Sequence, residues 1–224
     1  KRGAPLPVFV ACAAESAGPE EWRVRLAMTH IPGESLNRFL DRRRAKAGLF
    51  AGSLYHRFSE ACRFARELVA QLAPAFARIS AIAYHRDVNP RNILVEERGS
   101  VISYGLIDFG LAVDATAWRL GTTQSSSGEA VIGAWQVFGV GGDCRYWPVS
   151  AWLMLEQGPK ALYTRPQLCL EYKMHLDLHA LGITALQVLM ELTPAPPEAH
   201  AAGPDEALDR LWLLYAAWGR YWND

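Results

Sequence analysis

The strongest constraint on the fold is a long segment with helical periodicity, from about Leu54 to Ser80. Its apolar residues recur at steps of three and four positions, which is the spacing of one face of an α-helix. This stripe consists of Leu54, Phe58, Cys62, Phe64, Ala65, Leu68, Val69, Leu72 and Phe76. A helix with such a stripe buries it against other elements, so we expect the core to form around this segment.

The other predicted elements are short strands and helices on either side of it. Two strand-like runs, "PVFVACAA" and "EWRVRLAMT", open the chain, and two more, "ILVEE" and "YGLID", are joined by an "RGS" turn. Helices are predicted from Ser35 through "LNRFLDRRRAKA", from about Lys173 to Leu192, and over "DEALDRLWLLYAAWGRYW". This order of elements predicts an α+β fold in which helix dominates.

The segment from Leu111 to about Leu170 breaks this regularity. It is rich in Gly, Ser and Trp and shows few clear periods. A long irregular segment in a compact domain is usually functional or mobile, so we expect few regular elements here.

Composition excludes some classes of partner. The chain has 224 residues, of which 50% are hydrophobic, and its 23 basic and 23 acidic residues give a formal net charge of zero. We therefore expect no nucleic-acid partner and no attraction to anionic membranes. No apolar run reaches the length of a membrane span. The four cysteines form no CxxC pair, which favours free thiols in a reducing compartment, cytoplasmic or nuclear.

The polar stretch "YHRDVNPRN", Tyr84 to Asn92, stands between apolar segments and precedes "DFG" at Asp108 to Gly110. Phosphoryl transfer needs a carboxylate that accepts the proton of the attacking hydroxyl, together with oxygen ligands for a metal ion. Asp87 suits the first role. Asn92 and Asp108 suit the second, because the strand pair between them brings both to one end of a hairpin.

"HRDVNPRN" followed by "IDFGLA" resembles the catalytic loop and metal-binding motif of eukaryotic protein kinases. The resemblance implies a kinase-like fold and an enzyme that transfers the γ-phosphate of ATP to a hydroxyl of a protein substrate, with Mg²⁺. It implies that Asp87 is the base and that Asn92 and Asp108 hold the metal. His85 is expected to stack on Phe109, with Gly110 completing the motif.

The resemblance extends to the flanking segments. "LAMTHIPGESL" resembles the hinge between the two lobes of a kinase, which implies that Met28 is the gatekeeper. Adenine would then meet the backbone of the following residues and the side chain of Leu94. The hinge positions are Thr29, His30 and Ile31. "LDLHALG" resembles the start of the central buried helix, in which Asp177 accepts hydrogen bonds from the turn that carries Asp87.

Positive charge near the transferred phosphate is expected from this loop. Serine/threonine kinases carry Lys where this chain has Asn89, whereas tyrosine kinases carry Arg where it has Arg91, so the type of hydroxyl stays open. Arg86 is expected to pair with a phosphate in "GTTQSSSGE". The candidate acceptors there are Thr122, Thr123 and Ser125 to Ser127. For the segment that docks the substrate, "WPVSAWLMLE" loosely resembles the run Phe-Pro-Val-Lys-Trp-Met-Ala-Pro-Glu of tyrosine kinases. A rival alignment sets "GDCRYWP" against the Gly-Thr-Pro-x-Tyr run of serine/threonine kinases.

The resemblance divides the chain into three parts. Residues 1–31 correspond to remnant strands of the N-lobe and the hinge, residues 32–192 to the C-lobe, and residues 193–224 to a linker and an amphipathic helix. A Gly-rich loop and a strand lysine are missing before Met28, so the chain resembles the middle of a kinase domain. Two alternatives follow: a pseudokinase or interaction module without turnover, and a small-molecule phosphotransferase.

Overall fold

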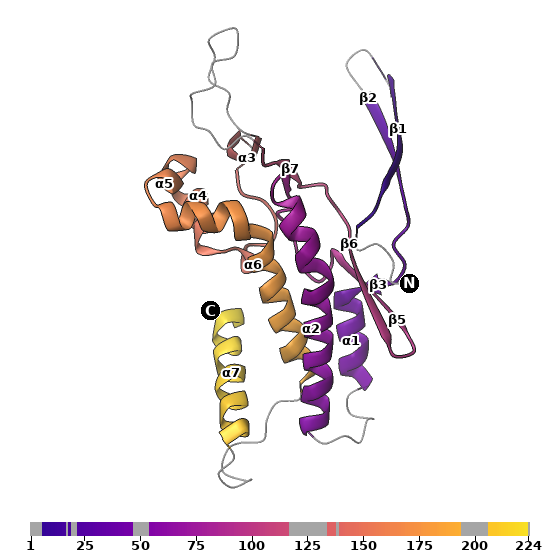
Figure 1. Ribbon diagram of the computed structural model, residues 1–224, viewed down its shortest axis with the longest axis vertical. Coiled ribbons are helices and arrows are strands. Elements are labelled where there is room, and N and C mark those ends of the chain that lie inside the picture. The colour runs from indigo at the N-terminus through magenta and orange to yellow at the C-terminus, as the bar shows by residue number, and fades with distance from the viewer. Residues whose placement is uncertain are drawn as a thin grey trace.

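The computed structural model describes residues 6–16, 18, 22–46, 54–116, 134–137, 139–193 and 206–223. Two long helices, α2 (Leu54–Ile79) and α6 (Pro166–Leu192), pack along each other at its centre, and α1 (Leu36–Lys46) lies beside them (Figure 1). The periodic segment therefore forms the expected helix. Mixed helix and strand agree with the predicted α+β class.

Apolar side chains from α1, α2, α6 and a small sheet meet in the main core. Phe39, Phe64, Leu68, Leu72 and Leu181 are all at most 1% exposed. Val69 differs from the expected stripe, because its side chain is 38% exposed. An amphipathic helix exposes the residues at the margin of its stripe, and Val69 lies at that margin.

The small sheet contains three antiparallel strands in the order β3 (Glu34–Ser35), β5 (Ile93–Arg98) and β6 (Val101–Leu106). Ile93 pairs with Leu106 at one end of the β5–β6 hairpin. Gln71 of α2 ties β6 to the helix, because its side-chain amide donates to the Ile102 carbonyl at 2.9 Å and accepts from the Tyr104 N–H at 3.0 Å. The hairpin is thus fixed on α2 in one register.

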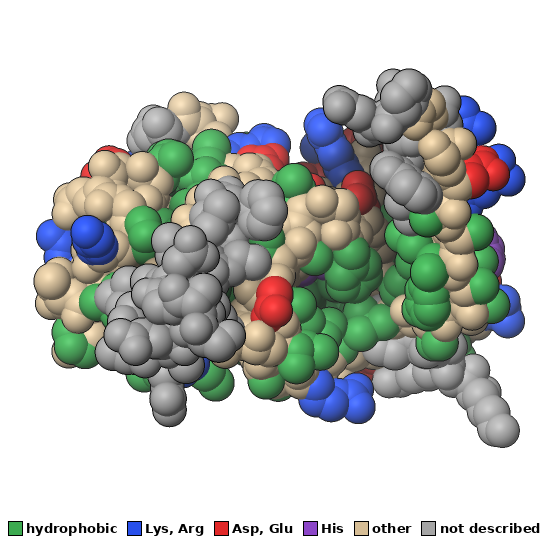
Figure 2. Space-filling view, turned by 90° about the horizontal axis from the view of Figure 1, so that it is seen from above, with side chains coloured by type: hydrophobic (Ala, Val, Ile, Leu, Met, Phe, Trp, Pro, Cys, Tyr) green, Lys and Arg blue, Asp and Glu red, His purple; other side chains and the backbone are tan. Residues whose placement is uncertain are grey.

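A second hairpin, β1 (Phe9–Ser16) with β2 (Trp22–Met28), extends away from this core. Every residue of β1 is exposed. Figure 2 shows hydrophobic side chains on the side of this hairpin that faces the rest of the molecule, across a hollow. The exposed large hydrophobic residues here are Val8, Phe9, Val10, Leu26 and Met28.

The segment expected to be irregular contains more helix than the sequence predicted. It holds α3 (Ala134–Val137), a 3-10 turn η2 (Cys144–Tyr146), α4 (Val149–Gln157) and α5 (Pro159–Tyr163). Helix α6 also begins at Pro166, before the predicted start. Pro166 suits the first turn of a helix, where its missing N–H is not needed, so the start signal is a proline.

A second core lies beneath these short elements. The strand pair β4 (Ala83–Tyr84) and β7 (Val113–Asp114) borders it. The rings of Tyr84 and Trp135 both pack on Tyr172 of α6, each at 5.7 Å between ring centroids. The start of α6 is thereby anchored next to the polar loop that follows β4.

The last helix, α7 (Glu206–Asn223), lies beside α6 at the side of the molecule away from the β1–β2 hairpin (Figure 1). Its position matches the amphipathic helix expected at the end of the chain. In the part of the chain that the structure describes, no helix combines the length and apolar character needed to cross a membrane.

Phe64 gives a direct test of this packing. Phe64→Ala removes a ring that is 1% exposed and lies 5.2 Å from the ring of Phe39. We expect the free energy of unfolding to fall by about 3–5 kcal/mol, measured by chemical denaturation. Val69→Ala, on the exposed margin of the same helix, is the matched control and should change it by about 0.5 kcal/mol or less. Equal effects of the two variants would contradict the proposed core.

Candidate functional site

A buried carboxylate of α6 holds the polar loop that follows β4. Asp177 accepts hydrogen bonds from the backbone N–H groups of His85, at 2.7 Å, and Arg86, at 2.8 Å. Arg86 has a φ of 69°, in the left-handed region that is costly for a residue other than glycine. Burial raises the pKa of Asp177, and the two N–H groups oppose this by stabilising the carboxylate. The contact between Asp177 and the loop therefore holds a strained backbone turn in place.

The ring of His85 connects this loop to the segment after β6. Its Nδ1 accepts from the backbone N–H of Asp87 at 3.3 Å, and its Nε2 lies 3.0 Å from the Ile107 carbonyl oxygen. Both contacts are satisfied by the tautomer with hydrogen on Nε2. The His85 ring also meets the Phe109 ring edge-on, with centroids 4.7 Å apart. The structure thus brings together the two motifs singled out in the sequence.

The β5–β6 hairpin places Asn92 beside the start of the second motif. The Ile107 N–H donates to the Asn92 carbonyl at 2.9 Å, directly beyond the last strand pair. Asp108 follows, exposed and with a φ of 62°, and its Oδ1 accepts from the Gly110 N–H at 3.1 Å. Asn92 and Asp108 therefore flank the same end of the hairpin, as their spacing predicted.

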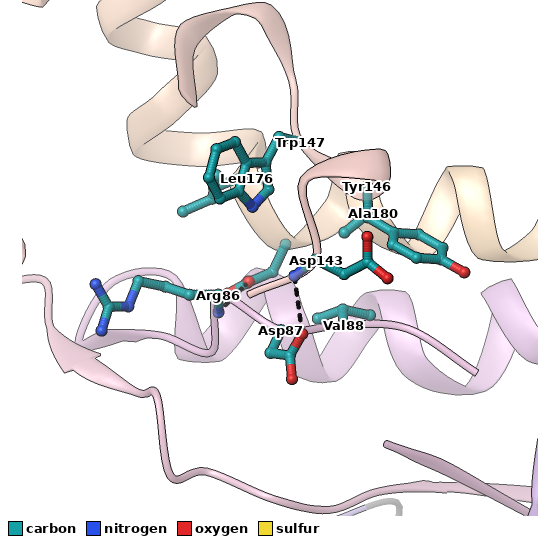
Figure 3. A pocket seen from close by; sticks show the side chains of 9 residues that line it. Arg86, Asp87, Val88, Asp143, Tyr146, Trp147, Leu176 and Ala180 are labelled. Carbon is teal, nitrogen blue, oxygen red and sulfur yellow. Dashed lines mark hydrogen bonds between the residues drawn. The ribbon is translucent and has the colours of Figure 1, made fainter. Parts of the chain in front are cut away.

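Three N–H donors hold the carboxylate of Asp87. Oδ1 accepts from Asn89 Nδ2 at 2.8 Å and from the backbone N–H of Asp143 at 3.2 Å, and Oδ2 accepts from Asn92 Nδ2 at 2.7 Å. Figure 3 shows Asp143 above Asp87, across a small cavity of about 10 Å³ that Val88 also lines. The sequence did not point to Asp143, because a backbone donor from a distant segment leaves no residue-type signal.

The sequence pointed to both Asn89 and Arg91 as candidate residues near the transferred phosphate, but the structure gives them different surroundings. Asn89 is buried and has no charge; its Nδ2 holds Asp87 and its Oδ1 accepts from the Arg91 N–H at 2.9 Å. Arg91 is exposed at the rim. Asn89 therefore holds the Asp87 carboxylate, whereas Arg91 is the one of the two that carries a positive charge.

The guanidinium of Arg86 contacts backbone carbonyls from both ends of a long segment. Its Nε donates to the Leu111 oxygen at 2.6 Å and its Nη1 to the Gly139 oxygen at 2.7 Å. Burial lowers the pKa of Arg86 from its usual value. The expected phosphate acceptors, Thr122, Thr123 and Ser125 to Ser127, lie outside the described residues. Arg86 thus already has acceptors without a phosphate.

The hinge residues lie where β2 leads toward the three-stranded sheet. The N–H of Thr29 is already used, because it donates to the Val8 oxygen at 2.9 Å, and its Oγ1 accepts from the Val8 N–H at 2.8 Å. The Ile31 side chain lies against Gly105, where an added Cβ would come within 2.4 Å of it. Gly105 pairs with Leu94, so Ile31 and Leu94 lie on the same face of the sheet.

Met28 and His30 complete this stretch and are both exposed, Met28 to 54% of its surface. Figure 2 shows a hollow beside the β1–β2 hairpin, and β2 ends at Met28. The resemblance to kinases implies that these residues contact the base of a nucleotide. The N–H of Thr29 is not available for that purpose. Among the described residues, no backbone hydrogen bond engages the N–H of His30 or Ile31, so these two keep the predicted donors.

Oxygen atoms suited to a hard cation are present at Asn92 and Asp108. The hydrogen bonds of Asn92 use its Nδ2, which leaves Oδ1 as an acceptor, and Asp108 keeps Oδ2. The described residues contain no group of three or more His, Cys, Asp or Glu side chains that could hold a metal. This pair therefore fits Mg²⁺ bound together with phosphate oxygens better than a site made by protein alone.

Comparison with known proteins gives one partial match. The chain is 46% identical over 62 residues to CBL-interacting protein kinase 22 from Oryza sativa subsp. japonica. The match covers 27% of this chain and 13% of that kinase. No protein-family model matches the chain. These findings support a relationship to protein kinases for a small part of the chain.

Asp177→Asn tests the support beneath the loop. The substitution keeps the shape but turns one acceptor into an NH₂ group, which then faces the backbone N–H of His85 or Arg86. We expect the free energy of unfolding to fall by about 1–3 kcal/mol in chemical denaturation, because one buried donor loses its partner. Glu156→Gln, at an exposed carboxylate of α4, is the control and should have little effect. Equal stability of Asp177→Asn and wild type would contradict the assigned contact.

Proposed function

We propose that this chain is part of a protein kinase that transfers the γ-phosphate of ATP to a hydroxyl of a protein substrate. The observation that carries the proposal is the convergence of Asp87, Asn92 and Asp108 at one edge of the β5–β6 hairpin, tied together through His85 and Ile107. The partial identity to a plant protein kinase supports the same relationship. Phosphoryl transfer depends mainly on positioning and charge, and this edge supplies both.

Asp87 would orient the attacking hydroxyl and accept its proton. Its carboxylate is held by Asn89, Asn92 and the Asp143 amide, so its direction is set before a substrate arrives. A general base held in this way avoids a reorientation cost during the reaction. The proton leaves the hydroxyl oxygen for a carboxylate oxygen of Asp87 as the hydroxyl oxygen attacks the γ-phosphorus. The bond from that phosphorus to the bridging oxygen of ATP breaks, and ADP leaves with that oxygen.

Asn92 and Asp108 would hold Mg²⁺ through Asn92 Oδ1 and the Asp108 carboxylate. Bound Mg²⁺ supplies positive charge that neutralises the phosphates of ATP. Asp108 is exposed, so its carboxylate can reach a metal that also binds phosphate oxygens. Arg91 would add positive charge at the rim, next to the phosphate that moves.

The nucleotide base would occupy the hollow between the β1–β2 hairpin and the three-stranded sheet. Met28 at the end of β2, with Ile31 and Leu94 on the sheet, provides apolar contacts. The backbone of His30 and Ile31 provides hydrogen bonds, as does the carbonyl of Thr29. In this proposal residues 1–31, 32–192 and 193–224 serve as the remnant N-lobe with the hinge, the C-lobe, and the linker with α7.

Asp87 and Asp108 allow the steps of this proposal to be separated. Asp87→Asn should reduce transfer to protein by about 10²–10⁴-fold, because the proton acceptor is lost, while binding of Mg·ATP persists. Asp108→Asn should weaken both binding and transfer. The measurements are phosphate incorporation from labelled ATP and a thermal-shift titration with Mg·ATP, in the full-length protein. The control is Asp114→Asn, at an exposed aspartate of β7 whose side chain, among the described residues, accepts hydrogen bonds from Thr116 alone.

Three results would contradict the proposal in distinguishable ways. Transfer that survives Asp108→Asn excludes this site as the centre of the reaction. No stabilisation of the wild type by millimolar Mg·ATP favours a pseudokinase or interaction module. Transfer to a small molecule but to no protein favours a small-molecule phosphotransferase.

A further inference from the structure

A short turn connects Asp87 with the last helix of the chain. The turn runs from Gly142 to Trp147 and contains η2. Gly142 has a φ of +87°, and an added Cβ there would lie 2.1 Å from the Arg86 carbonyl oxygen and 3.0 Å from Asp87 Oδ1. Only glycine fits this approach without displacing backbone. The turn is therefore in direct contact with the loop that carries Asp87.

The turn is internally braced, so its residues move together. Asp143 Oδ1 accepts from the backbone N–H and the Nε of Arg145, at 3.1 and 3.0 Å, and Asp143 Oδ2 accepts from Nη2 at 2.6 Å. The Tyr146 N–H donates to the Asp143 carbonyl at 3.0 Å. On the far side, the Tyr146 hydroxyl donates to Gln187 of α6 at 2.6 Å. A displacement of Arg145 or Tyr146 would therefore also displace Asp143.

Helix α7 contacts the outer side of this turn. The Tyr221 hydroxyl donates to the Arg145 carbonyl at 2.6 Å. The Trp222 ring meets the Tyr146 ring edge-on at 5.8 Å between centroids, and the Arg145 guanidinium lies 5.0 Å from the centroid of Trp222. One aromatic pair therefore provides a hydrogen bond, a ring contact and a cation–π contact to two adjacent residues.

We propose that Tyr221 and Trp222 are positioning residues for Asp87, acting through this turn. They hold Arg145 and Tyr146 so that the Asp143 N–H stays on Asp87 Oδ1. The inference rests on the proposed function for its effect on catalysis. The contact itself can be measured without any activity.

The location of Asp143 explains why such support matters. Its N–H is one of two donors to Asp87 Oδ1, at 3.2 Å against 2.8 Å for Asn89, so it is the longer contact and the more easily lost. Asn89 and Asn92 lie within the loop itself, whereas Asp143 comes from a separate segment. If the turn moves away, Asp87 Oδ1 loses the hydrogen bond from Asp143, and the carboxylate can rotate toward the vacated space.

Two variants of α7 test this inference at different levels of disruption. Tyr221→Phe removes one hydroxyl from a side chain that is 48% exposed, so the fold should be kept. Trp222→Ala removes the ring contact with Tyr146 and the cation–π contact with Arg145, together with the stacking on Trp218, and Trp222→Phe restores an aromatic ring. Leu213→Ala, at a residue of the same helix that is 63% exposed, is the matched control.

The first readout is hydrogen exchange of the amides in the 142–147 turn, in the full-length protein. We expect exchange about tenfold faster in Trp222→Ala, a smaller increase in Tyr221→Phe, near wild-type exchange in Trp222→Phe and no change in Leu213→Ala. The second readout is transfer kinetics. We expect kcat to fall about 10-fold or more in Trp222→Ala, because misplacing a catalytic group by about 1 Å can cost 100-fold. KM for ATP and stabilisation by Mg·ATP should be unchanged.

Each result that departs from these expectations has a different meaning for the inference. Unchanged exchange in both Tyr221→Phe and Trp222→Ala would overturn the inference, whatever the activity. Faster exchange with unchanged kcat would also overturn it, because the turn would then not position Asp87. A fall in kcat matched by weaker Mg·ATP binding would indicate general unfolding and contradict a positioning role. If the wild type transfers no phosphate, the proposed function fails and the catalytic role fails with it, while exchange still decides whether α7 holds the turn.

Discussion

The buried carboxylate of Asp177 is the interaction on which the site depends. It lies in the middle of α6 and accepts two backbone N–H groups, from His85 and Arg86. Removing a carboxylate from water is costly, and hydrogen bonds to the charged form offset that cost only if both donors stay in place. The same two donors belong to a turn with a left-handed Arg86, which is itself unfavourable. Neither feature is stable alone, and together they set the position of Asp87.

Within the loop, hydrogen bonds to neutral groups hold the charged side chains of Asp87 and Arg86. The carboxylate of Asp87 is held by two amide side chains and one backbone N–H, and Arg86 is held by two carbonyls. Neutral donors orient a carboxylate without consuming its charge, which stays available for a proton. Arg91 and Asp108, by contrast, are exposed. The site therefore combines a carboxylate held in one direction with exposed charged groups at its rim, which is the arrangement that the proposed function needs.

Much of the helical frame was predictable because periodicity acts locally. The stripe of α2 and the spacing of Asp87, Asn92 and Asp108 depend on residues near each other in the chain, so their types carry the signal. Helices α4 and α5 escaped prediction, because α4 is short and carries an exposed apolar face, with Val149 65% exposed. The contact of Asp143 with Asp87 had no signal in the sequence, since every residue except proline offers a backbone N–H. The contact of the Thr29 N–H with the Val8 oxygen was not predictable for the same reason, because it is a backbone hydrogen bond between distant segments.

The two sides of the proposed nucleotide hollow differ in how firmly they are built. The floor belongs to the β5–β6 hairpin, which packs on α2 and carries Leu94. The other side is the β1–β2 hairpin, a two-stranded sheet whose β1 residues are all exposed, and such hairpins are marginally stable in water. A nucleotide that binds between them would bury apolar surface of Met28 and its neighbours, and part of its binding free energy would be spent on ordering the hairpin. In the proposed function, the residues for transfer are thus set by the packed fold, whereas the exposed hairpin would be ordered by the nucleotide itself.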